Sequence, residues 1–308
     1  MPSQTHRVGP ADGLRVVDAG NNDNYVSTGI AGTLDTDQAD YIEAKINRFA
    51  SFRAVEMRSK NDAFTADEIP TLFAALAQHP DWYVFDEDFL TGPATDDTTS
   101  LPLNWAAITD YAGPAIDSTD GAGGWARVHV DSTDNDETYI SSLGENWLFA
   151  ASKPLIFMCK FKHTAGSTDG KSSFVVGLSD TVAADSIVDA GTLMTSYDGC
   201  VFFKDEDGSH ILFASSNATT QDSADLVAWV DADVFEGGFI FDPGAGTTGT
   251  LTPFYLTTAS DWSTITMGTA QSITLSGLAE MHLLLGAKTH EANLQDVDVD
   301  YVKVIAKR

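Results

Sequence analysis

From Trp82 to the end of the chain, short apolar runs alternate with turn-forming residues, and this pattern most constrains the fold. The runs are rich in valine, isoleucine and phenylalanine, which favour strands. Segments such as "TDGAGG", "EDGS" and "DPGAGTTG" favour the turns between them. Many strands with almost no helix between them predict a mainly β fold, in which two antiparallel sheets pack as a jelly-roll sandwich.

Twelve runs of this kind are predicted as strands. They are Trp82–Phe85, Trp125–Val130, Thr138–Ser141, Leu155–His163, Ser173–Leu178, Cys200–Asp205, Ile211–Ser215, Leu226–Val230, Glu236–Asp242, Leu251–Thr257, Met281–Ala287 and Val297–Ala306. No repeat of fixed period relates them, which disfavours a propeller or a solenoid.

The first 80 residues differ in texture from the rest of the chain. Residues 1–33 are rich in glycine, asparagine and aspartate, which predicts an extended arm. Two short helices are predicted after the arm, the first at about Asp37–Met57 and the second within Pro70–Pro80. We therefore expect an N-terminal arm with two helices at 1–80, which anchors or oligomerises the chain, and a sandwich domain at 81–308.

The two predicted helices bury little surface by themselves, so they should pack on another part of the protein. Their partner is either the β domain of the same chain or a neighbouring subunit, and the sequence leaves both open. The apolar side chains predicted to make this interface are Ile42, Ile46, Phe49, Phe52, Phe64, Leu72 and Phe73.

The charge of the chain limits its partners. There are 17 Lys and Arg against 45 Asp and Glu, a net charge of −28, which argues against nucleic acid or an anionic membrane as partner.

The two cysteines, Cys159 and Cys200, fall in predicted strands and are expected to be buried free thiols. The N-terminus lacks the pattern of a secretory signal and no apolar run is long enough to span a bilayer. A soluble product made in the cytoplasm is therefore expected.

Five segments carry a resemblance to a known family. They are "FDEDFLTG" at 85–92, "ENWLFAASKPLIFMCKFKH" at 145–163, "SSFVVGLSD" at 172–180, "DGCVFFKDEDGSHILFA" at 198–214, and the closing "VDVDYVKVIAKR" at 297–308. In their order and texture they resemble the concanavalin A-like or laminin-G-like jelly-roll domains of tailed-phage virion structural proteins.

The resemblance implies a non-enzymatic viral structural protein, a capsid decoration or cement protein on the virion surface that is made in the host cytoplasm. Its partners would be the major capsid protein and copies of itself, as a dimer or trimer. An alternative is a carbohydrate-binding lectin-like module or adhesin that binds surface glycans, with or without calcium. A polysaccharide-cleaving enzyme is a third, weaker alternative.

One acidic loop is a candidate metal site. The segment "DSTDNDET" between two predicted strands contains Asp131, Asp134, Asp136 and Glu137, and clustered carboxylate oxygens suit Ca²⁺. The spacing is not that of an EF-hand, so an ordinary polar loop is the other interpretation. No other cofactor is expected.

No catalytic residue is predicted. Glycosidase chemistry needs two carboxylates flanking the scissile bond, and the Glu-x-Asp-x-x-Glu strand of jelly-roll glucanases is absent. The nearest acidic strand carries Asp296, Asp298 and Asp300 on one side, which we interpret as a solvated face. Simple alternation places Val302 and Val304 on that same side.

Overall fold

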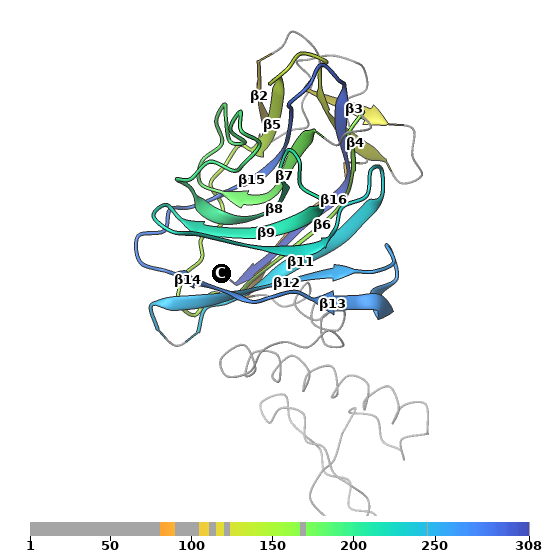
Figure 1. Cartoon of the computed structure of the whole chain (residues 1–308). Coiled ribbons are helices and arrows are strands. Elements are labelled where there is room, and N and C mark those ends of the chain that lie inside the picture. Colours follow the sequence, from red (N-terminus) through yellow and green to blue (C-terminus); the bar gives the residue numbers. More distant parts are fainter. Residues whose placement is uncertain are drawn as a thin grey trace, which may run out of the picture. The chain divides into compact units, whose positions relative to one another are not determined.

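A computed structural model of the chain describes residues 81–89, 105–110, 115–119, 124–166, 171–244 and 246–307. These residues form two antiparallel sheets that face each other, so the predicted mainly β sandwich is confirmed (Figure 1). The predicted arm, both helices and all seven predicted interface residues lie outside the described residues, and the predicted boundary at residue 80 stays a prediction.

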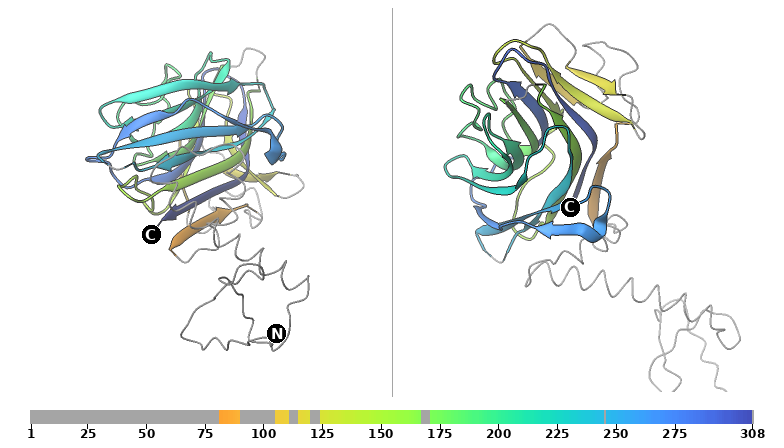
Figure 2. Two further views of the ribbon diagram at one scale, coloured as in Figure 1. Left: turned by 90° about the horizontal axis from the view of Figure 1, so that it is seen from below. Right: turned by 45° about the vertical axis from the view of Figure 1, so that its right-hand side comes forward.

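Sheet A has nine strands, of which seven follow one another in the order β13-β12-β11-β6-β16-β4-β3. Their bounds are Ile265–Met267, Thr248–Leu256, Val234–Asp242, Leu155–Thr164, Gln295–Lys307, Trp125–Val130 and Ile116–Thr119. In addition, β1 (Trp82–Glu87) pairs with the end of β16, and β14 (Gln271–Thr274) pairs with the start of β12. Figure 2 shows β1, in orange, alongside β16, in dark blue.

Sheet B has seven strands in the order β10-β9-β8-β7-β15-β5-β2. Their bounds are Gln221–Ala228, His210–Asn217, Asp198–Lys204, Ser172–Ser179, His282–Thr289, Glu137–Ser142 and Trp105–Thr109. A short 3-10 helix, η2 (Trp262–Thr264), precedes β13. Among the described residues, no helix is long and apolar enough to cross a membrane.

All twelve predicted strands are present: β4 has the predicted bounds, and the others differ at one or both ends by one to five residues. Four further strands, β2, β3, β13 and β14, were not predicted, because each is short and carries few of the β-branched runs that mark a strand. Both cysteines are free and buried, as expected.

Phenylalanine rings join the two sheets in the core. Phe239 on β11 of sheet A lies with its ring centroid 5.1 Å from that of Phe157, which belongs to the same sheet. On the opposite side it meets Phe213 and Phe202 of sheet B at 5.7 and 6.3 Å. None of these four side chains is more than 1% exposed. Burial of large rings supplies much of the apolar area that stabilises a sandwich.

A β-bulge in β16 corrects the predicted alternation of its last residues. The pairing of β16 with β6 shifts between Val299 and Tyr301, and one extra residue in a strand moves all later side chains to the opposite face. Val302 and Val304 therefore join the core, on the side away from the acids.

The edge of sheet B is also irregular. β10 has a neighbour, β9, on one side only, and its pairing with β9 shifts between Asp225 and Val227. Its side chains are half-buried or exposed along its whole length. β10 is therefore a partly exposed edge strand of sheet B.

His163, near the end of β6, is expected to make folding sensitive to acid. Its ring is 2% exposed and lies 5.0 and 5.6 Å from those of Phe174 and Trp229. Burial lowers the pKa of His163 to about 4. In the unfolded chain the imidazole of His163 takes up a proton near pH 6.5. The free energy of unfolding is therefore undiminished by this group above about pH 6.5, and it falls by up to about 3 kcal/mol as the pH drops to about 4.

Urea unfolding of the wild type and of His163→Phe, measured across that pH range, checks the expectation. The variant should lose less stability than the wild type on acidification, because it has no imidazole to protonate. Parallel pH profiles for the two proteins would contradict it.

Candidate functional site

The connection between β7 and β8, residues 180–197, covers the outer face of sheet B. Its side chains Ile187, Leu193 and Tyr197 are buried against apolar residues of that face, among them Tyr139 on β5 and Leu284 on β15. A second, smaller hydrophobic cluster therefore lies outside the sandwich. It fixes the connection on the sheet.

A buried ion cluster holds the same connection. Lys288 on β15 is 1% exposed, and its Nζ lies 3.2 Å from Glu137 Oε2, 2.6 Å from Asp185 Oδ1 and 2.7 Å from Asp189 Oδ1. Burial alone would lower the pKa of Lys288, but the hydrogen bonds to Asp185 and Asp189 and the charge of Glu137 raise it above its ordinary value. Two strands and the connection are thus joined through one ammonium group.

We call this cluster of Lys288, Glu137, Asp185 and Asp189 the clamp, and Glu137 makes further hydrogen bonds in it. Its carboxylate accepts the backbone N–H of Asp185 at 2.9 Å and the hydroxyl of Tyr139 at 3.0 Å. Asp185 has a φ of 58°, a left-handed conformation that costs energy for a residue with a side chain. Gly286, opposite Tyr139, makes room for its ring, since a Cβ there would lie 2.2 Å from Tyr139 Cδ1.

One of the four predicted calcium ligands, Glu137, belongs to the clamp. Its carboxylate is engaged with Lys288 and with the backbone N–H of Asp185 on the outer face of sheet B. Burial and the charge of Asp110, with a smaller effect of Asp131, raise the pKa of Asp136. Among the described residues, no group of three or more His, Cys, Asp or Glu side chains could hold a metal ion. Calcium binding stays a prediction.

The acids of β16 form ion pairs instead of the predicted solvated face. Asp298 is 1% exposed, and its two carboxylate oxygens lie 2.7 Å from Arg127 Nε and 2.8 Å from Lys162 Nζ. Burial would raise the pKa of Asp298, but the hydrogen bonds from these two cations hold it below its ordinary value. Asp296 pairs with His129 at 2.7 Å, and Asp300 with Lys160 at 2.6 Å. Each of the three acids thus has a basic side chain as its partner.

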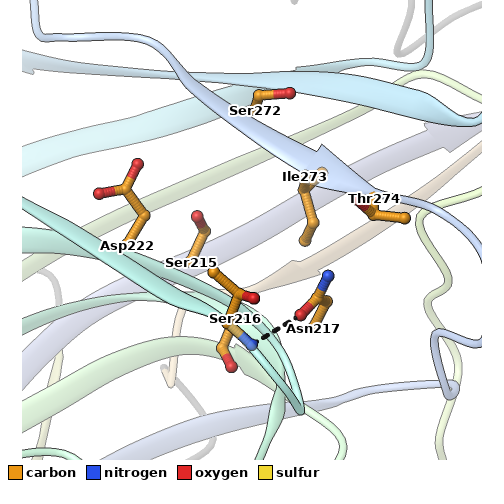
Figure 3. Close-up of a pocket in the computed structure, with 8 residues that line it drawn as sticks. Ser215, Ser216, Asn217, Asp222, Ser272, Ile273 and Thr274 are labelled. Atoms are coloured by element: carbon orange, nitrogen blue, oxygen red, sulfur yellow. Dashed lines mark hydrogen bonds between the residues drawn. The ribbon is translucent and has the colours of Figure 1, made fainter.

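A polar pocket, which we call the edge pocket, opens at the side of the sandwich between β9, β10 and β14 (Figure 3). Its volume is about 110 Å³. The β9–β10 hairpin lines it with Ser215, Ser216, Asn217, Thr220 and Asp222. Sheet A lines it with Ser272, Ile273 and Thr274. Seven of the eight lining residues are polar, and the eighth, Ile273, is 3% exposed and belongs to the core.

The β9–β10 hairpin shapes one wall of the edge pocket. Asn217 Oδ1 accepts hydrogen bonds from the backbone N–H of Thr220 at 2.9 Å and from the hydroxyl of Thr219 at 3.0 Å. Such bonds within a turn are typical of asparagine. Ala218 has a φ of 62°, and its N–H donates to the carbonyl of Tyr197 at 2.8 Å. The hairpin is thereby tied to the covering connection.

Gln271 joins the two sheets beside the pocket. Its side chain is buried, and its Nε2 donates to the carbonyl of Phe213 at 2.9 Å. Its Oε1 accepts from the hydroxyl of Ser215 at 2.7 Å. Because both ends of the amide are bonded, the wall formed by β9 and β14 is held in one arrangement.

Sequence reasoning missed the edge pocket. The signal in the sequence was the density of hydroxyl and amide side chains in "SSNATTQD", residues 215–222. The opposite wall could not be foreseen, because β14 was not predicted and its pairing with β12 places it there.

Several solved structures, two of them lectins, are similar to part of this chain at low sequence identity. Lectin UEA-II in complex with galactose has a TM-score of 0.49 and 12% identity, with 73% of this chain and 99% of that chain covered. Basic winged bean lectin with Tn-antigen has a TM-score of 0.49 and 8% identity, with 73% and 98% covered. A protein of unknown function from Shewanella oneidensis has a TM-score of 0.47 and 12% identity, with 80% and 96% covered. The likeness is one of fold alone.

No protein-family model matches the sequence, and no curated protein matches it either. The predicted virion role, with its capsid partner, oligomeric state and location, stays a prediction. The side chains predicted to make its subunit contacts lie outside the described residues.

Proposed function

We propose that this chain is a non-enzymatic, lectin-like carbohydrate-binding module, and that the edge pocket receives one side of a sugar ring. The observation that carries the proposal is the lining of the pocket, which combines residues with hydroxyl, amide and carboxylate groups and a single apolar residue. Sugars present hydroxyl groups around a partly apolar ring, so a site for them needs both kinds of surface.

The polar groups of the edge pocket offer both donors and acceptors. Asn217 uses its Oδ1 within the hairpin, and its Nδ2 donates to no other group among the described residues. The hydroxyls of Thr220, Ser272 and Thr274 can each donate and accept. The carboxylate of Asp222 accepts only. A ligand with several hydroxyl groups can pair with such a mixed set.

The size of the pocket limits the affinity. At about 110 Å³ it is small beside the clefts of about 300 to 1,000 Å³ that enclose most of a drug-sized ligand. One edge of a pyranose enters such a space, while the rest of the ring stays in water. A single sugar should therefore bind with a dissociation constant of about 1 mM.

The lining residues are also the reason why we propose a site without catalytic activity. Hydrolysis of a glycosidic bond uses two carboxyl groups placed on either side of it. The described residues that line the edge pocket include a single carboxylate, that of Asp222. The proposed site therefore binds a sugar without cleaving it.

Saturation-transfer NMR with the full chain and neutral monosaccharides at millimolar concentration tests the proposal. Galactose, glucose, mannose and N-acetylglucosamine are compared with and without calcium, which also tests the calcium-dependent alternative. Thr274→Phe places a ring at the exposed rim of the pocket and should weaken binding about tenfold or more, by steric exclusion.

Thr258→Phe is the matched control, because Thr258 is an exposed threonine that does not line the pocket. It should bind as the wild type does. If none of the sugars bind, or if Thr274→Phe binds them as well as the control, the proposal is wrong.

A further inference from the structure

Resting on the proposed function, we infer that the edge pocket selects neutral and amino sugars over acidic sugars, and that Asp222 determines this specificity. The starting observation is the charge of the lining. Among the eight residues that line the pocket, Asp222 carries the single charge, and none is a lysine, arginine or histidine. A carboxylate alone in a binding site disfavours a second negative charge.

Asp222 is placed to act on a ligand. It lies on β10 directly across from Ser215 on β9, so the two side chains share the side of the sheet that faces the pocket. Figure 3 shows both side chains in the wall of the pocket. Within the described part of the chain, Asp222 makes no ion pair. Its charge is therefore available to the ligand.

Hydrogen bonding favours the same ligands. Asp222 accepts hydrogen bonds and donates none, so its partner on the ligand must be a donor such as a sugar hydroxyl or an ammonium group. A bond between a carboxylate and an ammonium group is charge-assisted and stronger than one between neutral groups. The carboxylate of a uronic acid offers no donor to Asp222.

The surroundings reinforce this preference. The whole chain has a net charge of −28, which adds to the repulsion of an acidic ligand. The Nδ2 of Asn217, which also lines the pocket, is neutral and can donate to a hydroxyl or a ring oxygen. An acidic sugar would therefore meet repulsion without a compensating cation.

Two matched series of ligands test the inference with the full chain. The first is glucose, glucosamine and glucuronate, and the second is galactose, galactosamine and galacturonate. Dissociation constants are measured by NMR titration at low salt and at about pH 6, where the amines are protonated. In the series that binds, we expect the amino sugar to bind at least as tightly as the neutral sugar, and the uronate about tenfold more weakly or worse.

Asp222→Asn keeps the size of the side chain and removes its charge. The three sugars of a series should then bind with similar constants, within about threefold, since the charge that separates them is gone. Asp225→Asn is the matched control on the same strand, outside the pocket lining, and should leave the order unchanged. Added salt should narrow the wild-type differences.

The outcomes separate this inference from the proposed function. If sugars bind but the uronate binds as tightly as the neutral sugar, the specificity inference is wrong and the carbohydrate-binding function stands. The same holds if Asp222→Asn leaves the wild-type order intact. If no member of either series binds, and mannose and N-acetylglucosamine do not bind either, the proposed function fails and the inference fails with it.

Discussion

Replacing Lys288 by methionine is expected to lower the free energy of unfolding by about 3 to 5 kcal/mol. The ammonium group of Lys288 is buried and faces three carboxylates. Asp185 and Asp189 are 62% and 69% exposed and can turn to water once it is gone. The carboxylate of Glu137 is 4% exposed and cannot, so it would remain as an uncompensated buried charge.

A double mutant shows whether this charge is the cause. Adding Glu137→Gln to Lys288→Met removes the stranded charge, and the amide oxygen can still accept from the N–H of Asp185. We expect the double mutant to be more stable than Lys288→Met alone, in chemical unfolding measured at neutral pH. The opposite result, costs that simply add, would contradict the ion cluster.

Lys171 offers a control for the removal of a lysine. Its Nζ lies 3.8 Å from Glu206 and from Glu291, and its side chain is 41% exposed. Exposed ion pairs of this kind contribute about 0 to 1 kcal/mol, so Lys171→Met should change the unfolding free energy by no more than that.

Replacing Phe239 by alanine should destabilise the sandwich by a similar amount, about 3 to 5 kcal/mol. This ring lies between Phe157 of its own sheet and Phe202 and Phe213 of the other, and no water reaches it. Its removal leaves a cavity that the two sheets, each held by its own hydrogen-bonded ladder, can close only in part. For a domain of this size the midpoint of thermal unfolding should fall by roughly 10 °C.

Calorimetry of two further variants provides an intermediate and a control for the change in the midpoint of thermal unfolding. Phe239→Leu keeps part of the buried volume and should lie between the wild type and Phe239→Ala. Leu143→Ala removes a side chain that is 64% exposed and should change the midpoint little. A decrease for Phe239→Ala no larger than that for Leu143→Ala would show that the ring does not join the sheets as described.

Much of the sandwich could be predicted from sequence, because each long strand carries its own signal. β4, with alternating buried and half-buried residues in "WARVHV", was predicted with the bounds that the structure shows. Short strands such as β13 and β14 are fixed by the neighbours they pair with, and their own residues say little. The bulge at Asp300 was missed because alternation assumes that no residue is inserted.

The candidate site was harder to predict than the fold. The edge pocket exists because the β9–β10 hairpin and β14 meet, although some 50 residues of chain separate Asp222 from Ser272. Glu137 was predicted as a calcium ligand from its neighbours in sequence, whereas its partners Asp185 and Lys288 are 48 and 151 positions away. Contacts between residues so distant along the chain leave no local pattern to read.

The irregular edge formed by β10 has a consequence for the protein in concentrated solution. A straight, apolar edge strand is a template on which a strand of another molecule can add, and such additions lead to aggregation. The bulge after Asp225 bends β10, and two exposed carboxylates, Asp222 and Asp225, repel a second acidic chain. Intermolecular strand addition is therefore disfavoured at this edge, and the mouth of the edge pocket stays accessible when many copies are crowded together.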